Sequence, residues 1–364
     1  MLSTSLFEEK PARSHGDREC FTRPRQVLLI VLAILGTAAF AADTSYRFIK
    51  EIKVGGEGGW DYLSVDAAAR RLYVTHATKV VVIDLDKEEV VGEITDLPGV
   101  HGFALAPDLG LGFASNGRES KAGIVDLKTL KTISKVDTGE NPDCILYVPG
   151  KREVYAFNGR GKSATVFEAK TGKVVATIPL PGKPEFAVLD PAAGRIYNNI
   201  EDTNELVALD MNTHQIAAKW PYAPGEGASG LAIDRQHHRL FIGCGNKVMV
   251  MMDSASGKVV GSVPIGDGVD ACVFDPDTAL VMSSNGEGSV TIAHLDTPDT
   301  LTVVQTLKTA RSARTMILDP GTHRIYLAAA DYEAAPAPVA GQPAPRPKMV
   351  PNSFRVLVYG QDNK

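Results

Sequence analysis

The sequence predicts an all-β fold, a seven-bladed β-propeller whose N-terminal strand completes the last blade. Two observations support this prediction. A bulky residue recurs seven positions after a fixed anchor residue, and successive anchors lie 40 to 44 residues apart. The chain also ends one strand short of a full repeat, and a matching strand stands near its beginning. The anchor pairs are Asp66/Tyr73, Ala106/Phe113, Val148/Tyr155, Asp190/Tyr197, Asp234/Phe241, Asp275/Met282 and Asp319/Tyr326.

A period of about 42 residues fits both helical-pair repeats and four-stranded propeller blades. The unit Leu63–Ile94 favours strands, because it consists of short runs rich in Val, Ile and Tyr that Gly, Asp and Lys separate. No window keeps the i, i+3, i+4, i+7 apolar spacing of a helix. Asp-Pro dipeptides predict tight hairpin turns between the first two strands of three units, at 190–191, 275–276 and 319–320. Each repeat is therefore expected to be a four-stranded antiparallel sheet.

One such sheet cannot bury both of its faces, so the repeats must stack around an axis. The last repeat offers the strands Met316–Leu318, Arg324–Ala329 and Phe354–Tyr359 before the chain ends. The segment Tyr46–Val54 matches the outer strands of the other repeats and is expected to supply the missing strand. This pairing would protect the sheet edges where the two ends meet, and it predicts one domain over residues 42–364.

The segment Arg71–His76 has the sequence RLYVTH and is followed by VVVIDLDKEEVVGEI. These residues resemble the YVTN-type β-propeller repeats, and the later units GRIYNN, HRLFIG and HRIYLAA follow the same frame more loosely. Over about residues 46–360 the chain is similar to the YncE-like group of seven-bladed propellers. The resemblance implies the fold and an exported or surface protein. It implies no particular chemistry, because its motifs are blade-packing residues.

Residues 1–41 are predicted to be a signal peptide with a long n-region. An apolar run over Val27–Gly36 follows two arginines, and Ala39-Phe40-Ala41 has the small-x-small pattern of a cleavage site. The alternative is a membrane anchor, but the apolar stretch is short for a membrane span. We therefore expect a periplasmic or secreted protein, cleaved between Ala41 and Ala42, that keeps no membrane span.

Composition argues against several classes of partner. Once residues 1–41 are removed, acidic residues exceed basic residues by six, which disfavours nucleic acid and anionic lipid. The remaining cysteines, Cys144, Cys244 and Cys272, show no CxxC spacing and are expected to be small buried side chains. No GxSxG, P-loop, HExxH or CxxCH motif is present, so no cofactor is predicted with certainty. We expect a monomer.

The best candidate site is a ring of polar residues five positions before each anchor, where the inner strands enter the central channel. Residues three before the anchors are apolar and form a packed layer beneath it. Crowded carboxylates raise one another's pKa unless a cation joins them, so the ring is suited to Ca²⁺, Mg²⁺ or a substrate amine. The competing interpretation is that acidic residues are ordinary in entry loops and that the arginine pairs with a neighbouring carboxylate. The ring residues are Asp61, His101, Asp143, Glu185, Ser229, Asp270 and Arg314.

Three further features belong to the same face. Trp60 and Tyr62 flank Asp61 of the ring. They are expected either to form an aromatic rim or, in the case of Trp60, to pack at a blade junction. His76 belongs to a set ten positions after the anchors, whose asparagines are best explained by turns with positive φ and otherwise by ligand contact. Residues 333–353 form a proline-rich loop in the last blade, which is either a lid or docking arm or an inert insertion.

The sequence supports two hypotheses of function. The first is an exported, non-catalytic propeller that presents its channel mouth to a protein, peptide or small ligand. The second is a divalent-metal-dependent enzyme of the lactonase or lyase kind. No nucleophile–base pair can be named, which favours the first hypothesis. In the second, the metal ligands would be Asp61, Asp143, Glu185 and Asp270, with His101 or His76 as general base.

Overall fold

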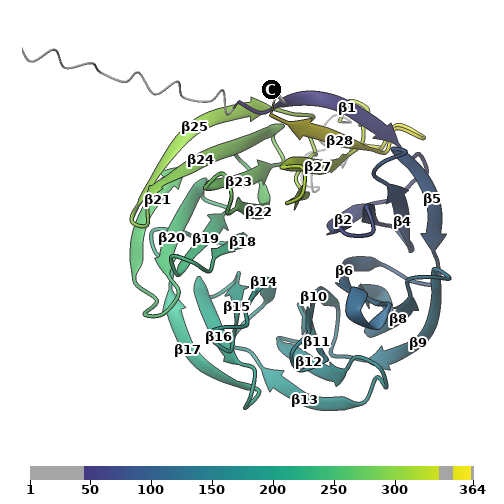
Figure 1. The fold of residues 1–364 in the computed structure, drawn as a ribbon, viewed down its shortest axis with the longest axis horizontal. Coiled ribbons are helices and arrows are strands. Elements are labelled where there is room, and N and C mark those ends of the chain that lie inside the picture. Colours follow the sequence, from purple (N-terminus) through teal and green to yellow (C-terminus); the bar gives the residue numbers. More distant parts are fainter. Residues whose placement is uncertain (1–44, 336–346, 362–364) are drawn as a thin grey trace, which may run out of the picture. The chain divides into compact units, whose positions relative to one another are not determined.

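The computed structural model describes residues 45–335 and 347–361, which form seven four-stranded antiparallel sheets around a central axis (Figure 1). The predicted seven-bladed propeller is confirmed. The predicted signal peptide, residues 1–41, lies outside the described residues, and so do residues 336–346 of the predicted proline-rich loop. In the part of the chain that is described, no helix has the length and apolar character to cross a membrane.

Each blade has an inner strand at the axis, two middle strands and an outer strand. The inner strands are β2 (Trp60–Asp66), β6 (Val100–Ala106), β10 (Pro142–Val148), β14 (Pro184–Asp190), β18 (Ala228–Asp234), β22 (Val269–Asp275) and β26 (Met316–Asp319). The second strands are β3 (Arg71–His76), β7 (Leu111–Asn116), β11 (Glu153–Asn158), β15 (Arg195–Ile200), β19 (Arg239–Cys244), β23 (Leu280–Asn285) and β27 (Arg324–Ala329).

The third strands are β4 (Lys79–Asp84), β8 (Lys121–Asp126), β12 (Ser163–Glu168), β16 (Glu205–Asp210), β20 (Val248–Asp253), β24 (Ser289–Thr297) and β28 (Arg355–Gly360). The outer strands are β5 (Glu89–Ile94), β9 (Lys131–Asp137), β13 (Val174–Pro179), β17 (Gln215–Pro221), β21 (Val259–Pro264), β25 (Thr300–Lys308) and β1 (Arg47–Lys53). Two short 3₁₀ turns, η1 (Pro107–Leu109) and η2 (Gly117–Glu119), belong to the second blade.

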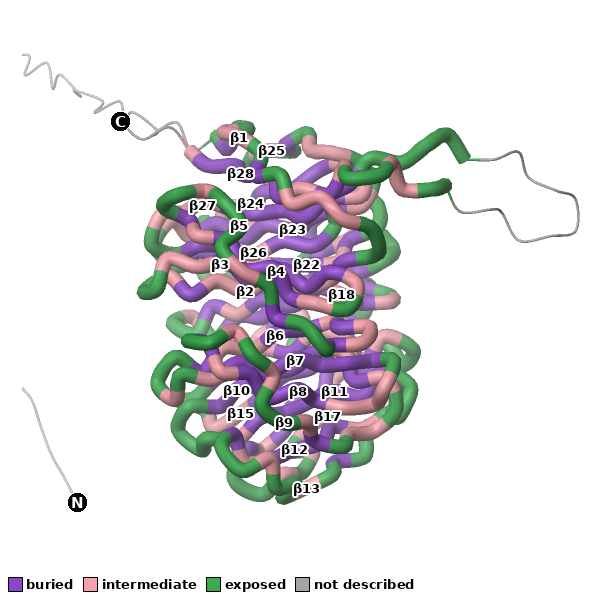
Figure 2. Tube along the Cα trace, turned by 90° about the vertical axis from the view of Figure 1, so that its right-hand side faces the viewer, coloured by how far each residue is buried: buried purple, intermediate pink, exposed green. Residues whose placement is uncertain are grey.

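The repeated bulky residue fills the wedge between neighbouring blades. Tyr73 of β3 stacks on Phe103 of the next inner strand, with ring centroids 5.2 Å apart. Phe241 of β19 stacks in the same way on Phe274 of β22, at 5.3 Å. The middle strands are buried because a blade covers each of their faces, whereas the outermost strands consist mainly of exposed and half-buried residues (Figure 2). The bulky residue seven positions after each anchor therefore recurs in this chain because it packs against the next blade.

The N-terminal strand closes the ring as predicted. β1 pairs antiparallel with β28, from Arg47 opposite Gly360 to Lys53 opposite Arg355. Just before it, Tyr46 is buried and donates its hydroxyl hydrogen to the carbonyl of His323 at 2.7 Å. The amide of Gln305 exchanges hydrogen bonds with the backbone of Tyr46, which connects the sixth blade to the strand that completes the seventh.

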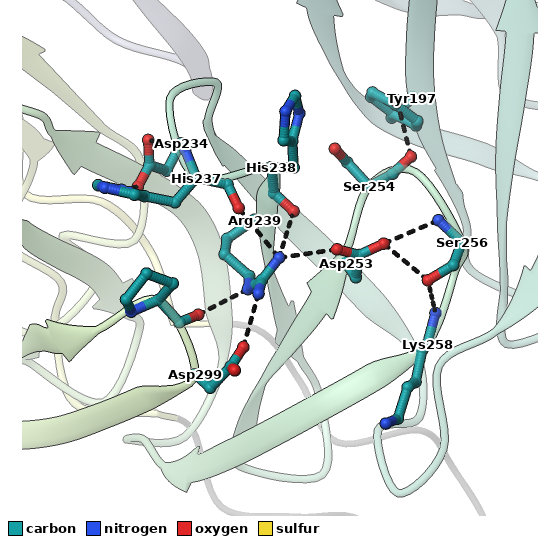
Figure 3. A network of polar contacts seen from close by, with 11 residues as sticks. Tyr197, Asp234, His237, His238, Arg239, Asp253, Ser254, Ser256, Lys258 and Asp299 are labelled. Atoms are coloured by element: carbon teal, nitrogen blue, oxygen red, sulfur yellow. Dashed lines mark hydrogen bonds and ion pairs between the residues drawn. The ribbon is translucent and has the colours of Figure 1, made fainter.

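A buried arginine joins the fifth and sixth blades at the end of the propeller away from the predicted ring (Figure 3). Arg239 is 9% exposed, and its Nη1 lies 2.8 Å from Oδ2 of Asp253 in the same blade. Its Nε and Nη2 donate to Pro298 and Asp299 in the turn between β24 and β25. The guanidinium thus satisfies backbone and carboxylate acceptors from two blades at once.

The proline-rich loop leaves β27 and returns to β28. Its described ends pair with each other, because Tyr332 and Met349 form a β-bridge and the backbone nitrogen of Glu333 donates to Lys348. Arg355, the first residue of β28, forms an ion pair with Asp331 at 2.9 Å. The ends of the loop are therefore fixed to the last blade.

Candidate functional site

A β-bulge at the start of six inner strands places the predicted ring at the channel mouth. In β2 the pairing with β3 shifts between Trp60 and Leu63, and in β10 the pairing with β11 shifts between Pro142 and Ile145. The same irregularity recurs in β6, β14, β18 and β22. A bulge turns a side chain out of the regular alternation. It therefore separates the ring from the apolar layer three positions before the anchors, which is buried as predicted.

Polar side chains of the second strands form hydrogen bonds with backbone carbonyls at the mouth of the next blade. Ser115 of β7 donates to the carbonyl of Asp143 in the next blade. Asn199 of β15 donates in the same way to the carbonyl of Ser229 at 3.2 Å, and Ser284 of β23 donates to the carbonyl of Arg314. The backbone at the mouth is thus held from the neighbouring blade, which fixes where the ring side chains project.

Three ring residues from neighbouring blades converge on one point. The Nδ1 atom of His101 lies 2.7 Å from Oδ2 of Asp61 and 3.9 Å from Oδ1 of Asp143. One donor atom from each of these side chains lies within 4.8 Å of the others, a spacing that one metal ion can bridge. The side chains of His101, Asp61 and Asp143 are 30%, 20% and 14% exposed, so they are partly withdrawn from water but still accessible to a small ligand.

The other two acidic ring residues each have a cationic partner. Glu185 forms an ion pair with Lys183, which also contacts Glu201 at 2.5 Å. Asp270 accepts a hydrogen bond from Nε of Arg314 at 2.7 Å. The interpretation of Arg314 as the partner of a neighbouring carboxylate is therefore confirmed.

Three carboxyl groups of the ring, those of Asp143, Asp270 and Glu185, have raised pKa values. Burial and then the charge of Asp61 raise the pKa of Asp143 to about 7. Burial and Asp61 also raise the pKa of Asp270 to about 6, although Arg314 opposes the change. Burial and the charge of Asp143 raise the pKa of Glu185 to about 8, against the hydrogen bond from Lys183. A cation that entered the ring would compete with these protons.

His101 responds to the same carboxylates in the opposite sense. Burial alone would lower its pKa, but the hydrogen bond to Asp61 and the charge of Asp143 outweigh this and raise it. The imidazolium form is therefore favoured while its two carboxylate neighbours are ionised.

Below the ring, an aromatic pair divides the channel. Tyr62 of β2 and Phe186 of β14 come from the first and fourth blades, and their ring centroids lie 5.3 Å apart. Both rings border two cavities. The first, of about 340 Å³, lies against β18, β22 and β26 and includes Asp61 and Asp270 in its wall. The second, of about 310 Å³, lies against β2, β6 and β10 and is lined by no ring carboxylate.

Trp60 and His76 lie in a separate aromatic cluster instead of pointing into the ring. Both rings pack against Phe354, with centroids 5.1 Å and 4.1 Å away, and both side chains are buried. Gly56 covers His76, since a Cβ at that glycine would lie 3.1 Å from its Cε1. Burial and then Lys79 lower the pKa of His76. This placement favours the blade-junction interpretation of Trp60.

The asparagines of the same set are structural, for a reason different from the one predicted. Asn116 has a φ of −102°, so the expected positive φ is wrong at this residue. Its buried amide donates to Glu119 at 2.8 Å, and Asn158 and Asn285 donate to Ser163 and Ser289. The buried amides fasten the hairpin between the second and third strands.

A second cluster of possible metal ligands lies at the other end of the sixth and seventh blades, and it consists of Asp275, Asp277 and His323. The Nδ1 atom of His323 lies 2.8 Å from Oδ2 of the buried Asp275. Arg70 contacts the buried Asp319 of the seventh blade in the equivalent way, at 2.7 Å. Because both contacts link an anchor aspartate to the next blade, we interpret the cluster as a connection between blades.

Three features of the mouth were not predicted from the sequence: Lys183, the polar residues of the second strands, and the contact between Tyr62 and Phe186 across the channel. Lys183 could have been found from the sequence, because it lies two positions before Glu185 and has the opposite charge. Ser115, Asn199 and Ser284 interrupt apolar strands at one position of the repeat, nine after the anchor. The contact between Tyr62 and Phe186 had no such signal, because it joins side chains that are far apart in the sequence.

Comparison with known proteins supports the fold and goes no further. No family model matches the sequence, and no curated protein matches it. Among solved structures, a chain described as Kuenenia stuttgartiensis hydrazine synthase superimposes with a TM-score of 0.65 at 15% identity. The match covers 77% of this chain and 96% of that one. At this identity the likeness shows the propeller architecture alone.

Proposed function

We propose that this chain is an exported, YncE-like propeller of the YVTN type that binds a small cationic ligand at its channel mouth and does not catalyse a reaction. The observation behind the proposal is the convergence of Asp61, His101 and Asp143, with Glu185 and Asp270 in the same ring. In this proposal residues 1–41 direct export, and the mature chain acts as a monomer. The propeller contributes a rigid frame that holds the ring side chains in place.

The electrostatics of the ring favour a cation over other small ligands. Burial and, after it, neighbouring carboxylates raise the pKa values of the ring, and a cation would relieve this negative charge whereas an anion would increase it. Lys183 and Arg314 already neutralise part of this charge at Glu185 and Asp270. Asp61 and Asp143 have only the shared His101 as an ion-pair partner among the described residues, which leaves part of their charge for a ligand.

The proposal is tested by thermal unfolding of the purified protein in a panel of small cations and anions at pH 5 and pH 8. A ligand at 100 times its dissociation constant stabilises the folded state by about 2.7 kcal/mol. We expect stabilisation by a subset of cations at pH 8, little at pH 5, and none by acetate. Asp143→Asn combined with Glu185→Gln should abolish the effect, whereas the exposed Asp137→Asn should preserve it. A melting temperature indifferent to every cation would refute the proposal.

The competing candidate is a metal-dependent lactonase- or lyase-type enzyme, and one observation favours it. Donor atoms of Asp61, His101 and Asp143 lie within 4.8 Å of one another. A bound divalent ion there would polarise a substrate carbonyl, and the ring nitrogen of His101 that became a ligand would have to be unprotonated. Elemental analysis of the purified protein decides between the two. Stoichiometric metal that is lost in Asp143→Ala/Glu185→Ala would support the enzyme.

A further inference from the structure

We propose that the channel mouth selects organic amines that carry an apolar group. The ammonium would bind to Asp61, Asp270 and Thr315, and the apolar group would fill the cavity below them. This inference rests on the proposed function, because it assigns a ligand class to the same ring. It adds a second requirement, a hydrophobic body of limited size, that a general cation site does not have.

The first support is the composition of the cavity of about 340 Å³. Two carboxylates, Asp61 and Asp270, belong to its wall, and most of the remaining wall is apolar. Val188, Val273 and Ile317 line it from three different inner strands. A bare metal ion or ammonium would leave this apolar space filled with water, whereas an alkyl or aryl group would release that water.

The second support is an unpartnered hydroxyl in the same wall. Thr315 is 4% exposed, and its Oγ1 has no hydrogen-bond partner among the described residues. A buried hydroxyl left in this state is costly, so it marks a place where a ligand group is expected. An ammonium has three N–H donors, and the two carboxylates and this hydroxyl supply acceptors for them.

The last blade differs from the others at the position of Thr315. Its inner strand β26 begins at Met316 and has four residues, without the bulge that opens the other inner strands. The second strand of this blade carries Ala328 at the position where four other blades carry Thr75, Ser115, Asn199 or Ser284, so this position offers no hydrogen-bonding side chain. Thr315 thus lies in a blade whose mouth departs from the repeat in two ways.

Asp61 and Asp270 each use one carboxylate oxygen in a contact within the ring, which leaves the other oxygen available to a ligand. His101 contacts Oδ2 of Asp61, and Arg314 contacts Oδ2 of Asp270. Each carboxylate therefore keeps a second oxygen, Oδ1, for an ammonium. The aromatic pair of Tyr62 and Phe186 closes this cavity off from its neighbour, which has a similar volume and no ring carboxylate.

The test is calorimetric titration of the purified protein at pH 8 with benzylamine, methylammonium and benzyl alcohol. We expect benzylamine to bind at least about tenfold more tightly than methylammonium, because only benzylamine buries an apolar ring. Benzyl alcohol, which lacks the charge, should show no measurable binding. Val273→Phe, which fills the cavity, should weaken benzylamine about tenfold and leave methylammonium unchanged. The matched control Leu146→Phe fills the neighbouring cavity and should change neither.

Thr315→Val tests the hydroxyl without depending on a larger side chain. The replacement removes an atom that has no protein partner, so we expect an unchanged or higher melting temperature together with weaker binding of benzylamine and of methylammonium. Equal affinity for benzylamine and methylammonium, or benzylamine binding that survives both Val273→Phe and Thr315→Val, would overturn the inference while the proposed function stands. Absence of binding by any cation in the panel would overturn the proposed function as well.

Discussion

The Nδ1 atom of His101 lies 2.7 Å from Oδ2 of Asp61, so one contact joins the mouths of the first and second blades. Neither residue belongs to the apolar packing between these blades, which Tyr73 and Phe103 provide. The contact therefore contributes charge and orientation at the mouth, and its effect on stability should follow the protonation of the histidine.

Replacing His101 by glutamine should destabilise the protein at low pH and much less at high pH. The folded state raises the pKa of His101, so the histidine contributes stability that is fully present below its unfolded pKa, near 6.5, and is lost as pH rises through the folded value. Urea unfolding of both proteins at pH 5.5, 7 and 9 measures the difference. The exposed pair of His294 and Asp296 provides the control, since His294→Gln should have little effect at any of these pH values. A His101→Gln difference that stays constant with pH would contradict the assignment.

The variant Asp143→Asn should be more stable than the parent at pH 8 and equal to it at pH 4. The folded state raises the pKa of Asp143 to about 7, so ionising this group costs folding free energy as pH rises from about 4 to 7. Asparagine has the same shape and no charge to relieve. Calorimetric melting at the two pH values should show a rise of a few degrees at pH 8 only. The Asp137→Asn variant changes a side chain that is 86% exposed and should show no such rise.

The sequence was sufficient to predict the blades and their closure, because both depend on features that repeat. The bulky residue seven after the anchor contacts the next blade in the structure, so its spacing reports a real packing distance. The strand predicted over Tyr46–Val54 is observed as Arg47–Lys53, paired with β28 as expected. A repeated contact leaves several copies of its signal, which makes it visible without a structure.

The geometry of the mouth was only partly predictable. Counting from the anchors identified the ring positions. The bulges that orient the ring side chains arise from a local shift in strand pairing, which residue types do not reveal. The unpaired hydroxyl of Thr315 lies in the blade that lacks this bulge, and the contact of Tyr62 with Phe186 joins two blades across the channel. Features that occur once, or that cross the axis, leave no repeated signal.

Replacing Arg239 by methionine should lower the free energy of unfolding by roughly 1–3 kcal/mol, because several hydrogen-bond acceptors lose their donor together. Methionine keeps most of the buried aliphatic length, so the loss reports the guanidinium contacts shown in Figure 3. Urea unfolding provides the measurement. Arg160 offers a control, because its side chain is 74% exposed and its ion pair with Glu140 is long at 3.8 Å. The Arg160→Met variant should therefore lose little stability. An Arg239→Met variant as stable as the parent would show that the network contributes no net stability.

Removing the closing strand should have a larger effect than any change at the mouth. A chain that begins at Gly55 loses β1, exposes the unpaired edge of β28 and uncovers the buried cluster beneath Ile52. We expect this chain to aggregate or to unfold at a much lower temperature, and a synthetic peptide of residues 42–54 to restore part of its stability. Size-exclusion chromatography and calorimetric melting measure both effects.

A pair of point variants tests the same closure without truncation. Tyr46→Ala removes a side chain that is 1% exposed and hydrogen-bonded to His323 at 2.7 Å, and it should cost roughly 3–5 kcal/mol. Phe48→Ala removes an aromatic ring that is 53% exposed, two residues along the same segment, and should cost far less because most of that ring already contacts water. Equal losses in urea unfolding would mean that the N-terminal segment is held by its backbone pairing with β28 rather than by Tyr46.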